Sequence, residues 1–157
     1  MAIDRQRVID SYLNGMGVIT TGPLSPADVG YDKSIEPWSY DPVAARRLLE
    51  EEGWVDRDGD GIREKEGVPF SFTMIYFIGN AISKLLSDYL TTALREIGVE
   101  CRCLGLDIAD LSARVETKDF DALNLGWSLG TPPPNHKQIW HSSGVDQKGS
   151  SNVTAYA

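Results

Sequence analysis

Apolar and polar positions alternate along the second half of the chain in a way that predicts strands and helices in turn. Residues 70–77 are rich in aromatic and apolar side chains, which is typical of a buried strand. A helix is predicted over 81–97, a strand over 99–106, a helix after Asp107 and a strand over 120–127. Strands and helices in this order form parallel sheets with right-handed crossovers. The sequence therefore predicts an α/β fold with a mainly parallel sheet flanked by helices.

The two helices of this region carry clear apolar stripes. In the first, apolar residues recur three and four positions apart: Ile82, Leu85, Leu86, Tyr89, Leu90, Ala93, Leu94 and Ile97. We expect this stripe to be buried and polar positions such as Ser83 and Ser87 to face water. In the second helix the residues expected to face inward are Ile108, Leu111 and Val115.

The first half of the chain is less regular. A helix is predicted over 2–14, and a second helix begins at its N-cap Asp41 and ends at Gly53. Between them, residues 18–40 are interpreted as a long loop, which is unusual inside a compact domain. Residues 142–157 are rich in Ser and Gly and are interpreted as a loop-like tail.

Composition and charge narrow the classes of partner. The chain has 157 residues, of which 41% are hydrophobic, and a net charge of −8. An acidic surface repels nucleic acid, so no nucleic-acid partner is expected. Cys101 and Cys103 are one residue apart, a spacing that differs from the C-x-x-C of redox and zinc sites, and they are interpreted as small strand residues.

Motifs for catalysis are absent from the sequence. His136 and His141 are the only histidines, and no nucleophile elbow, zinc-protease motif, Walker loop or dinucleotide-binding loop is present. We therefore expect a protein that is not an enzyme and that needs no cofactor.

An acidic turn leaves two interpretations open. Asp56, Asp58 and Asp60 precede a glycine in the pattern D-x-D-x-D-G, which begins a calcium-binding EF-hand loop. The twelfth position is Gly67, where such a loop has a bidentate Glu, and Glu64 replaces it only in part. The turn is thus either a structural turn, in which Asp side chains bond their own backbone, or a weak metal site in a stand-alone calcium-binding module.

The carboxyl ends of the predicted strands mark a candidate ligand site. Open parallel sheets bind ligands beyond these ends. Here they carry Asn80 and the segment with Trp127, Ser128, Gly130 and Thr131. A tryptophan offers a ligand a large apolar face, and the small polar residues after it offer hydrogen bonds. The alternative is that Trp127 belongs to the core.

Several short segments, spread over nearly the whole chain, resemble one known family. They are Met1 to Arg5, Gly15 to Gly17, Tyr40 to Pro42, Ala44 to Leu49, Gly53-Trp54, Asp56 to Gly61, Ile97 to Val99, Phe120 to Ala122, Gly126-Trp127, Ile139 to Ser143, and Asn152 with Tyr156. In this order and spacing they resemble the second lobe of the dipeptide/oligopeptide family of ABC-transporter solute-binding proteins.

The resemblance implies a two-lobed, periplasmic or extracytoplasmic receptor. Such a protein captures a small solute, a peptide or a related compound, in the cleft between its lobes and delivers it to a membrane permease. Residues 1–157 would then form a single partial domain, most of one lobe. The resemblance also implies that the acidic turn is structural. The residues after Met1 are polar from the third onwards, so no signal peptide is expected in this chain.

One position departs from the family pattern. Peptide-binding members have an Asp about three residues after the Gly-Trp pair, where it binds the ammonium group of the ligand. Gly130 occupies that position here. A buried ammonium without a carboxylate partner is costly. Either another acid such as Asp107 replaces it, or the ligand is neutral or anionic.

Overall fold

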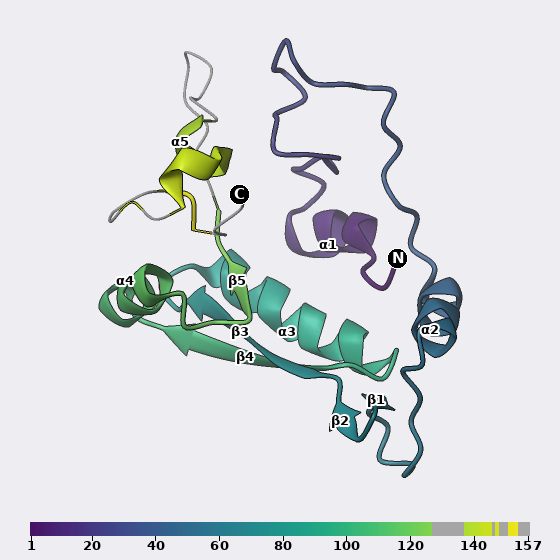
Figure 1. The fold of residues 1–157 in the computed structure, drawn as a ribbon. Coiled ribbons are helices and arrows are strands. Elements are labelled where there is room, and N and C mark those ends of the chain that lie inside the picture. The colour runs from purple at the N-terminus through teal and green to yellow at the C-terminus, as the bar shows by residue number, and fades with distance from the viewer. Residues whose placement is uncertain (127–136, 146, 148–150, 154–157) are drawn as a thin grey trace.

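A three-stranded parallel sheet lies at the centre of the fold (Figure 1). The computed structural model describes residues 1–126, 137–145, 147 and 151–153. β3 (Ser71–Phe77) is the middle strand, with β4 (Glu100–Leu106) on one side and β5 (Ala122–Asn124) on the other, and both neighbours run parallel to it. The predicted α/β class and the parallel pairing are confirmed.

Helices connect the strands and extend the fold at both ends of the sheet. α3 (Ala81–Arg95) joins β3 to β4, and α4 (Ile108–Thr117) joins β4 to β5. α1 (Arg5–Tyr12) packs against α3, and α2 (Pro42–Glu51) lies at the end of the sheet where β3 begins (Figure 1). A short α5 (Lys137–Trp140) and the 3₁₀ turn Ser142–Gly144 follow β5. Residues 18–40 contain neither helix nor strand.

The helix ends follow the chemistry of their capping residues. Asp41 precedes α2 and accepts a hydrogen bond from the amide of Ala44 at 2.8 Å, while Pro42 occupies the first helical turn. Gly53 ends the same helix with a φ of +87°, a conformation that costs glycine least.

The core is formed where α2, α3 and the sheet meet. Ala45, Ile97 and Val99 are buried together, and Phe70 and Phe72 pack against them from the start of β3. Further along the sheet Ile75 of β3 is fully buried.

α3 is rotated by about one position from the orientation predicted by its apolar stripe. Ser83 and Ser87 are buried against the sheet, whereas Ile82 and Leu85 are 48% and 41% exposed. The prediction that the two serines face water is therefore wrong. Small side chains let the helix approach the strands closely. The opposite side of α3 is partly covered by α1. Asp4, the N-cap of α1, contributes to this contact, since its amide donates a 3.0 Å hydrogen bond to the hydroxyl of Tyr89.

A two-stranded hairpin that the sequence did not predict precedes β3. β1 (Glu64–Lys65) pairs antiparallel with β2 (Val68–Pro69), and the two residues between them, Glu66 and Gly67, both have positive φ. Two residues in this conformation form the tight turn that suits the twist of a hairpin.

Arg63 lies at the junction of the hairpin, α2 and the loop after α3. Its guanidinium donates hydrogen bonds to the carbonyls of Ile97 and Trp54 and to the carboxylate of Glu50, each at 2.9 Å. The arginine is buried, and its Cγ lies only 2.7 Å from the position that a Cβ at residue 98 would take. Gly98, with a φ of +81°, is therefore required both by its conformation and by the packing of Arg63.

No helix in the described ranges is long and apolar enough to cross a membrane.

Candidate functional site

The carboxyl ends of the three parallel strands meet at one edge of the sheet, as the sequence predicted. β3 and β4 end in register, with Phe77 opposite Leu106, and the amide of Ile78 extends the pairing by donating a 3.0 Å hydrogen bond to the carbonyl of Leu106. β5 pairs with the second half of β3 and ends at Asn124. This carboxyl edge is where open α/β sheets bind ligands.

Two polar residues at the carboxyl edge are the N-caps of the helices that follow, α3 and α4. The Oδ1 atom of Asn80 accepts hydrogen bonds from the amides of Ile82 and Ser83 at 3.0 and 3.2 Å. Asp107 caps α4 in the same way, with 2.9 Å hydrogen bonds from Ala109 and Asp110. In each residue the Oδ1 atom accepts hydrogen bonds from two helix amides. These residues therefore orient the helix N-termini at this edge.

The end of β5 is joined to the start of α3. The side-chain amide of Asn124 donates a 3.3 Å hydrogen bond to the carbonyl of Ser83. This bond fixes the last residue of β5 against the first turn of α3. The chain that continues towards Trp127 therefore leaves the sheet from a fixed position.

Apolar side chains follow each of the three strand ends and are exposed. Ile78 comes directly after β3, Ile108 begins α4, and Leu125 follows β5; they are 57%, 62% and 42% exposed. The prediction that Ile108 faces inward is wrong, because only Leu111 among the three inward candidates of α4 is buried. The sequence predicted a ligand site at this edge but not its apolar character, because Ile108 was expected to face inward and Leu125 falls within the predicted strand 120–127. The closeness of all three residues to strand ends was the signal available.

Close packing behind the carboxyl edge depends on Gly105 in β4. A Cβ at this position would lie 2.5 Å from Cγ2 of Ile78 and 2.9 Å from the Tyr76 ring. Only glycine leaves enough space for these two side chains to lie across β4. The exposed Ile78 is thus positioned by a contact inside the sheet.

The predicted recognition residues fall partly outside the described ranges. Asn80 lies at the carboxyl edge, as its place after β3 predicted. Trp127, Ser128, Gly130 and Thr131 lie outside the described residues, which stop at Gly126 and resume at Lys137.

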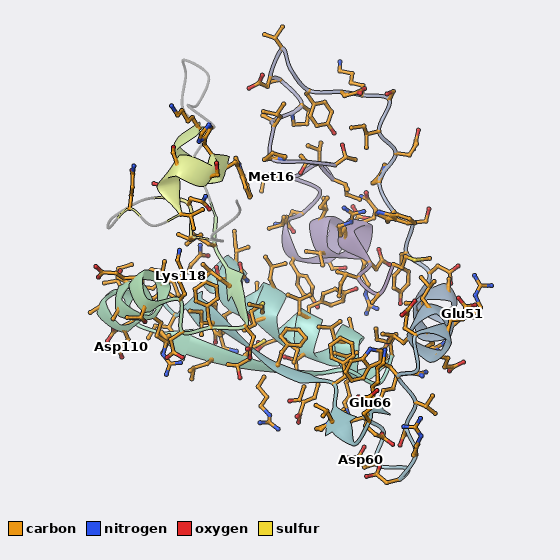
Figure 2. The ribbon with its side chains drawn as sticks, in the orientation of Figure 1. Met16, Glu51, Asp60, Glu66, Asp110 and Lys118 are labelled. Atoms are coloured by element: carbon orange, nitrogen blue, oxygen red, sulfur yellow. The ribbon has the colours of Figure 1, made fainter. Side chains whose placement is uncertain are left out.

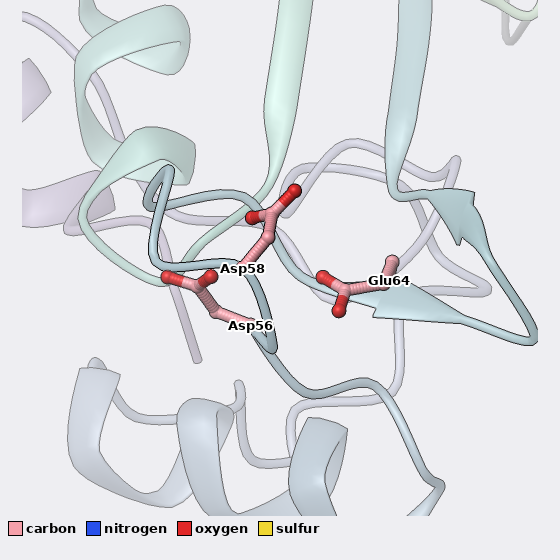
Figure 3. Close-up of side chains that lie close together, drawn as sticks. All are labelled: Asp56, Asp58 and Glu64. Carbon is pink, nitrogen blue, oxygen red and sulfur yellow. The ribbon is translucent and has the colours of Figure 1, made fainter.

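The acidic turn lies at the other end of the molecule, near the start of β3. In Figure 2 Asp60 marks this end, and Asp110 of α4 marks the opposite end. Carboxylate oxygens of Asp56, Asp58 and Glu64 lie within 4.8 Å of one another (Figure 3). The structure thus brings together three of the four residues of the predicted metal alternative.

Backbone amides already engage the carboxylates of this turn. The two oxygens of Asp56 accept hydrogen bonds from Gly59 and Gly61 at 2.8 and 3.0 Å. Asp60 stands apart from the cluster and accepts a hydrogen bond from Ile62 at 2.6 Å. Asp side chains bonded to amides two to five residues ahead are the mark of a self-organised turn.

A known family matches nearly the entire chain. The family described as bacterial extracellular solute-binding proteins, family 5, matches residues 1–149. The oligopeptide-binding protein AppA of Bacillus subtilis is 36% identical over 151 residues, which cover 92% of this chain and 27% of AppA. The nickel-binding periplasmic protein of Escherichia coli is 28% identical over 157 residues, covering 94% of this chain and 30% of that protein.

Solved structures agree with these sequence matches. The structure of AppA in complex with a nonapeptide superposes with a TM-score of 0.85 at 33% identity, covering 99% of this chain and 31% of that chain. NikA from Brucella suis in complex with Fe(III)-EDTA gives a TM-score of 0.74 at 25% identity, covering 98% and 30%. The chain therefore spans less than a third of the length of these relatives.

Proposed function

The chain belongs to the bacterial extracellular solute-binding proteins of family 5, and from this membership we propose that it forms part of one lobe of an ABC-importer receptor. The complete protein captures a small solute, a peptide or a related compound, in a cleft between two lobes. It then delivers the solute to a permease from outside the cytoplasm.

The carboxyl edge of the sheet is the proposed contribution of this chain to the cleft. The exposed apolar residues Ile78, Ile108 and Leu125 carry the proposal, because each lies within two residues of a strand end. A ligand or a second lobe at this edge would cover these side chains.

Trp127 is the proposed anchor for the solute, with Ser128, Gly130, Thr131 and Asn80 as polar neighbours. β5 ends at Asn124, three residues before Trp127 in the sequence. A tryptophan offers a ligand a large apolar face on which to stack.

The relatives bind different solutes, so membership alone does not choose the ligand. AppA is an oligopeptide-binding protein, and its similarity favours a peptide as the first solute to test. Because Gly130 replaces an acid of the peptide-binding members, we propose a peptide whose amino terminus is held by another acid or is blocked. The family match gives no support to a stand-alone calcium-binding module.

The test is Trp127→Ala in the complete protein, titrated with nonapeptides of mixed sequence carrying free or acetylated amino termini. We expect affinity to fall at least fivefold, because removing an aromatic anchor costs about 1 kcal/mol or more. Trp38→Ala is the matched control, since Trp38 is exposed and lies just before α2, at the opposite end of the sheet. Unchanged affinity in Trp127→Ala, with a large loss of stability, would place Trp127 in the core and remove the site.

A further inference from the structure

Two free thiols lie side by side on β4, away from the carboxyl edge. Cys101 and Cys103 are two residues apart on the strand, so both side chains point to the same face. This face is covered by α3: the thiol of Cys103 donates to the carbonyl of Ser87 at 3.4 Å, and its sulfur lies 3.2 Å from the hydroxyl of Thr91. The pair is opposite Phe72 and Met74, in the first half of β3.

The distance between the two sulfurs suits a shared metal ion. Their Sγ atoms are 3.8 Å apart. A tetrahedral ion bound at a metal–sulfur distance of about 2.3 Å holds two sulfurs about 3.8 Å apart. The thiols therefore need little movement to bind one ion. A thiol–thiol hydrogen bond has the same length, so access to the sulfurs is the second requirement.

An open cavity gives that access. A cavity of about 730 Å³ between α3 and β4 is lined by both cysteines and by Asp88, Thr91, Glu100 and Arg102, among others. β4 is an edge strand of the described sheet, so the cavity opens beside it. Cys101 is only 3% exposed, whereas Cys103 is partly exposed, so an ion entering the cavity meets Cys103 first.

The acidic residues of the cavity wall are engaged elsewhere. Glu100 accepts a 2.8 Å hydrogen bond from the hydroxyl of Ser71 and pairs with Arg102 at 2.6 Å, and these contacts, the Ser71 hydrogen bond first, lower the pKa of Glu100. Asp88 pairs with Lys84 at 2.6 Å. Among the described residues neither joins the thiols in a group of three metal-ligating side chains, so the two sulfurs are the protein's contribution.

We propose that Cys101 and Cys103 form a bidentate dithiolate site for a thiophilic divalent cation such as zinc or cadmium. Binding forms two metal–sulfur bonds and releases both thiol protons to solvent. Water molecules fill the remaining two positions of the tetrahedron from the cavity. This site is separate from the proposed solute cleft, because it lies beside the first half of β4.

The protons on the thiols make binding dependent on pH. A metal ion displaces the proton of each thiol that it binds. Affinity is expected to rise with pH by up to roughly a hundredfold per unit, because binding to two thiols releases two protons.

The experiment is a cadmium titration of the complete protein, with a phosphine reductant, followed by the ultraviolet sulfur-to-metal charge-transfer band. We expect a band that saturates at one ion for this dithiol and is accompanied by release of both thiol protons in weak buffer. Cys103→Ala should remove this band. Because Cys103 is partly exposed, the variant is expected to fold, which circular dichroism verifies.

Two further variants make the result decisive. Cys101→Ala, which changes the buried member, should also remove the band. Asp58→Asn alters the acidic turn and should leave the band and its saturation point unchanged. The proposal is overturned by the absence of a band at millimolar cadmium, by a band that survives in either cysteine variant, or by release of a single proton per ion.

Discussion

Arg63 is a charged residue in a buried position, and its hydrogen bonds join three parts of the chain. Its guanidinium contacts the carbonyls of Ile97 and Trp54 and the carboxylate of Glu50. Glu50 remains half exposed and can be solvated without its partner, whereas the two carbonyls are satisfied by Arg63. The main contribution of Arg63 is therefore to pair these backbone groups.

Arg63→Met should lower the free energy of unfolding by about 2–4 kcal/mol, because methionine fills similar space but leaves buried acceptors unpaired. Urea denaturation of the chain measures this change. Arg47→Met is the matched control: Arg47 pairs with Glu51 at 3.5 Å but is 69% exposed, so the loss should stay within about 0.5 kcal/mol. Equal losses in the two variants would contradict this role for Arg63.

At the same scale, local capping chemistry was predictable and long-range partners were not. The sequence predicts Asp41 as an N-cap and places Asp107 directly before a helix, and both accept amide hydrogen bonds. The buried position of Arg63 could not be predicted from the sequence, because its hydrogen-bond partners lie 9, 13 and 34 residues away. Such a set is formed only by tertiary folding.

Among the elements, the acidic turn is organised by its own backbone. Asp56 accepts two amide hydrogen bonds and Asp58 accepts one, from Asp60 at 3.1 Å. Gly59 and Gly61 have φ values of +80° and +85°, which the turn requires. The turn also connects to the hairpin, since Glu64 accepts a 2.8 Å hydrogen bond from the amide of Arg57.

Asp56→Ala should destabilise the chain by about 1–2 kcal/mol and Asp58→Ala by less, following the number of amide hydrogen bonds each one loses. The measurement is thermal or urea unfolding in the presence of a chelator, repeated with calcium. Because the hydrogen bonds need no metal, the same order is expected in both conditions. A loss that occurs only with calcium would identify the turn as a metal site.

For helices and strands, the sequence predicted the features that depend on a single pattern of apolar and polar residues. The parallel order of β3, β4 and β5 followed from strands alternating with helices. The orientation of α3 did not follow, because the helix has the sheet on one side and α1 on the other. An apolar stripe does not say which of two partners it faces, and here Ser83 and Ser87 make the closer approach to the sheet. The hairpin was not predicted, because strands of two residues are too short to show the alternation of apolar and polar side chains that identifies a strand.

For the whole molecule, the central observation is that the chain covers about 27–31% of the length of its matched relatives. In the proposed receptor the cleft lies between two lobes, and this chain, as part of one lobe, supplies only part of the contacts. Binding sites for small molecules typically bury about 70–90% of the ligand surface. We therefore expect the 157-residue chain alone to enclose less of a solute than that.

The proposed position of the binding site between two lobes is tested by calorimetric titration of the complete protein and of the 157-residue chain with the same nonapeptides. We expect the complete protein to bind with a Kd in the micromolar range or tighter, and the chain alone to show nothing tighter than about 0.1 mM, because half a cleft loses the contacts of the other lobe. If the chain binds as tightly as the complete protein, the site lies within this lobe and the proposal of a cleft between two lobes is wrong.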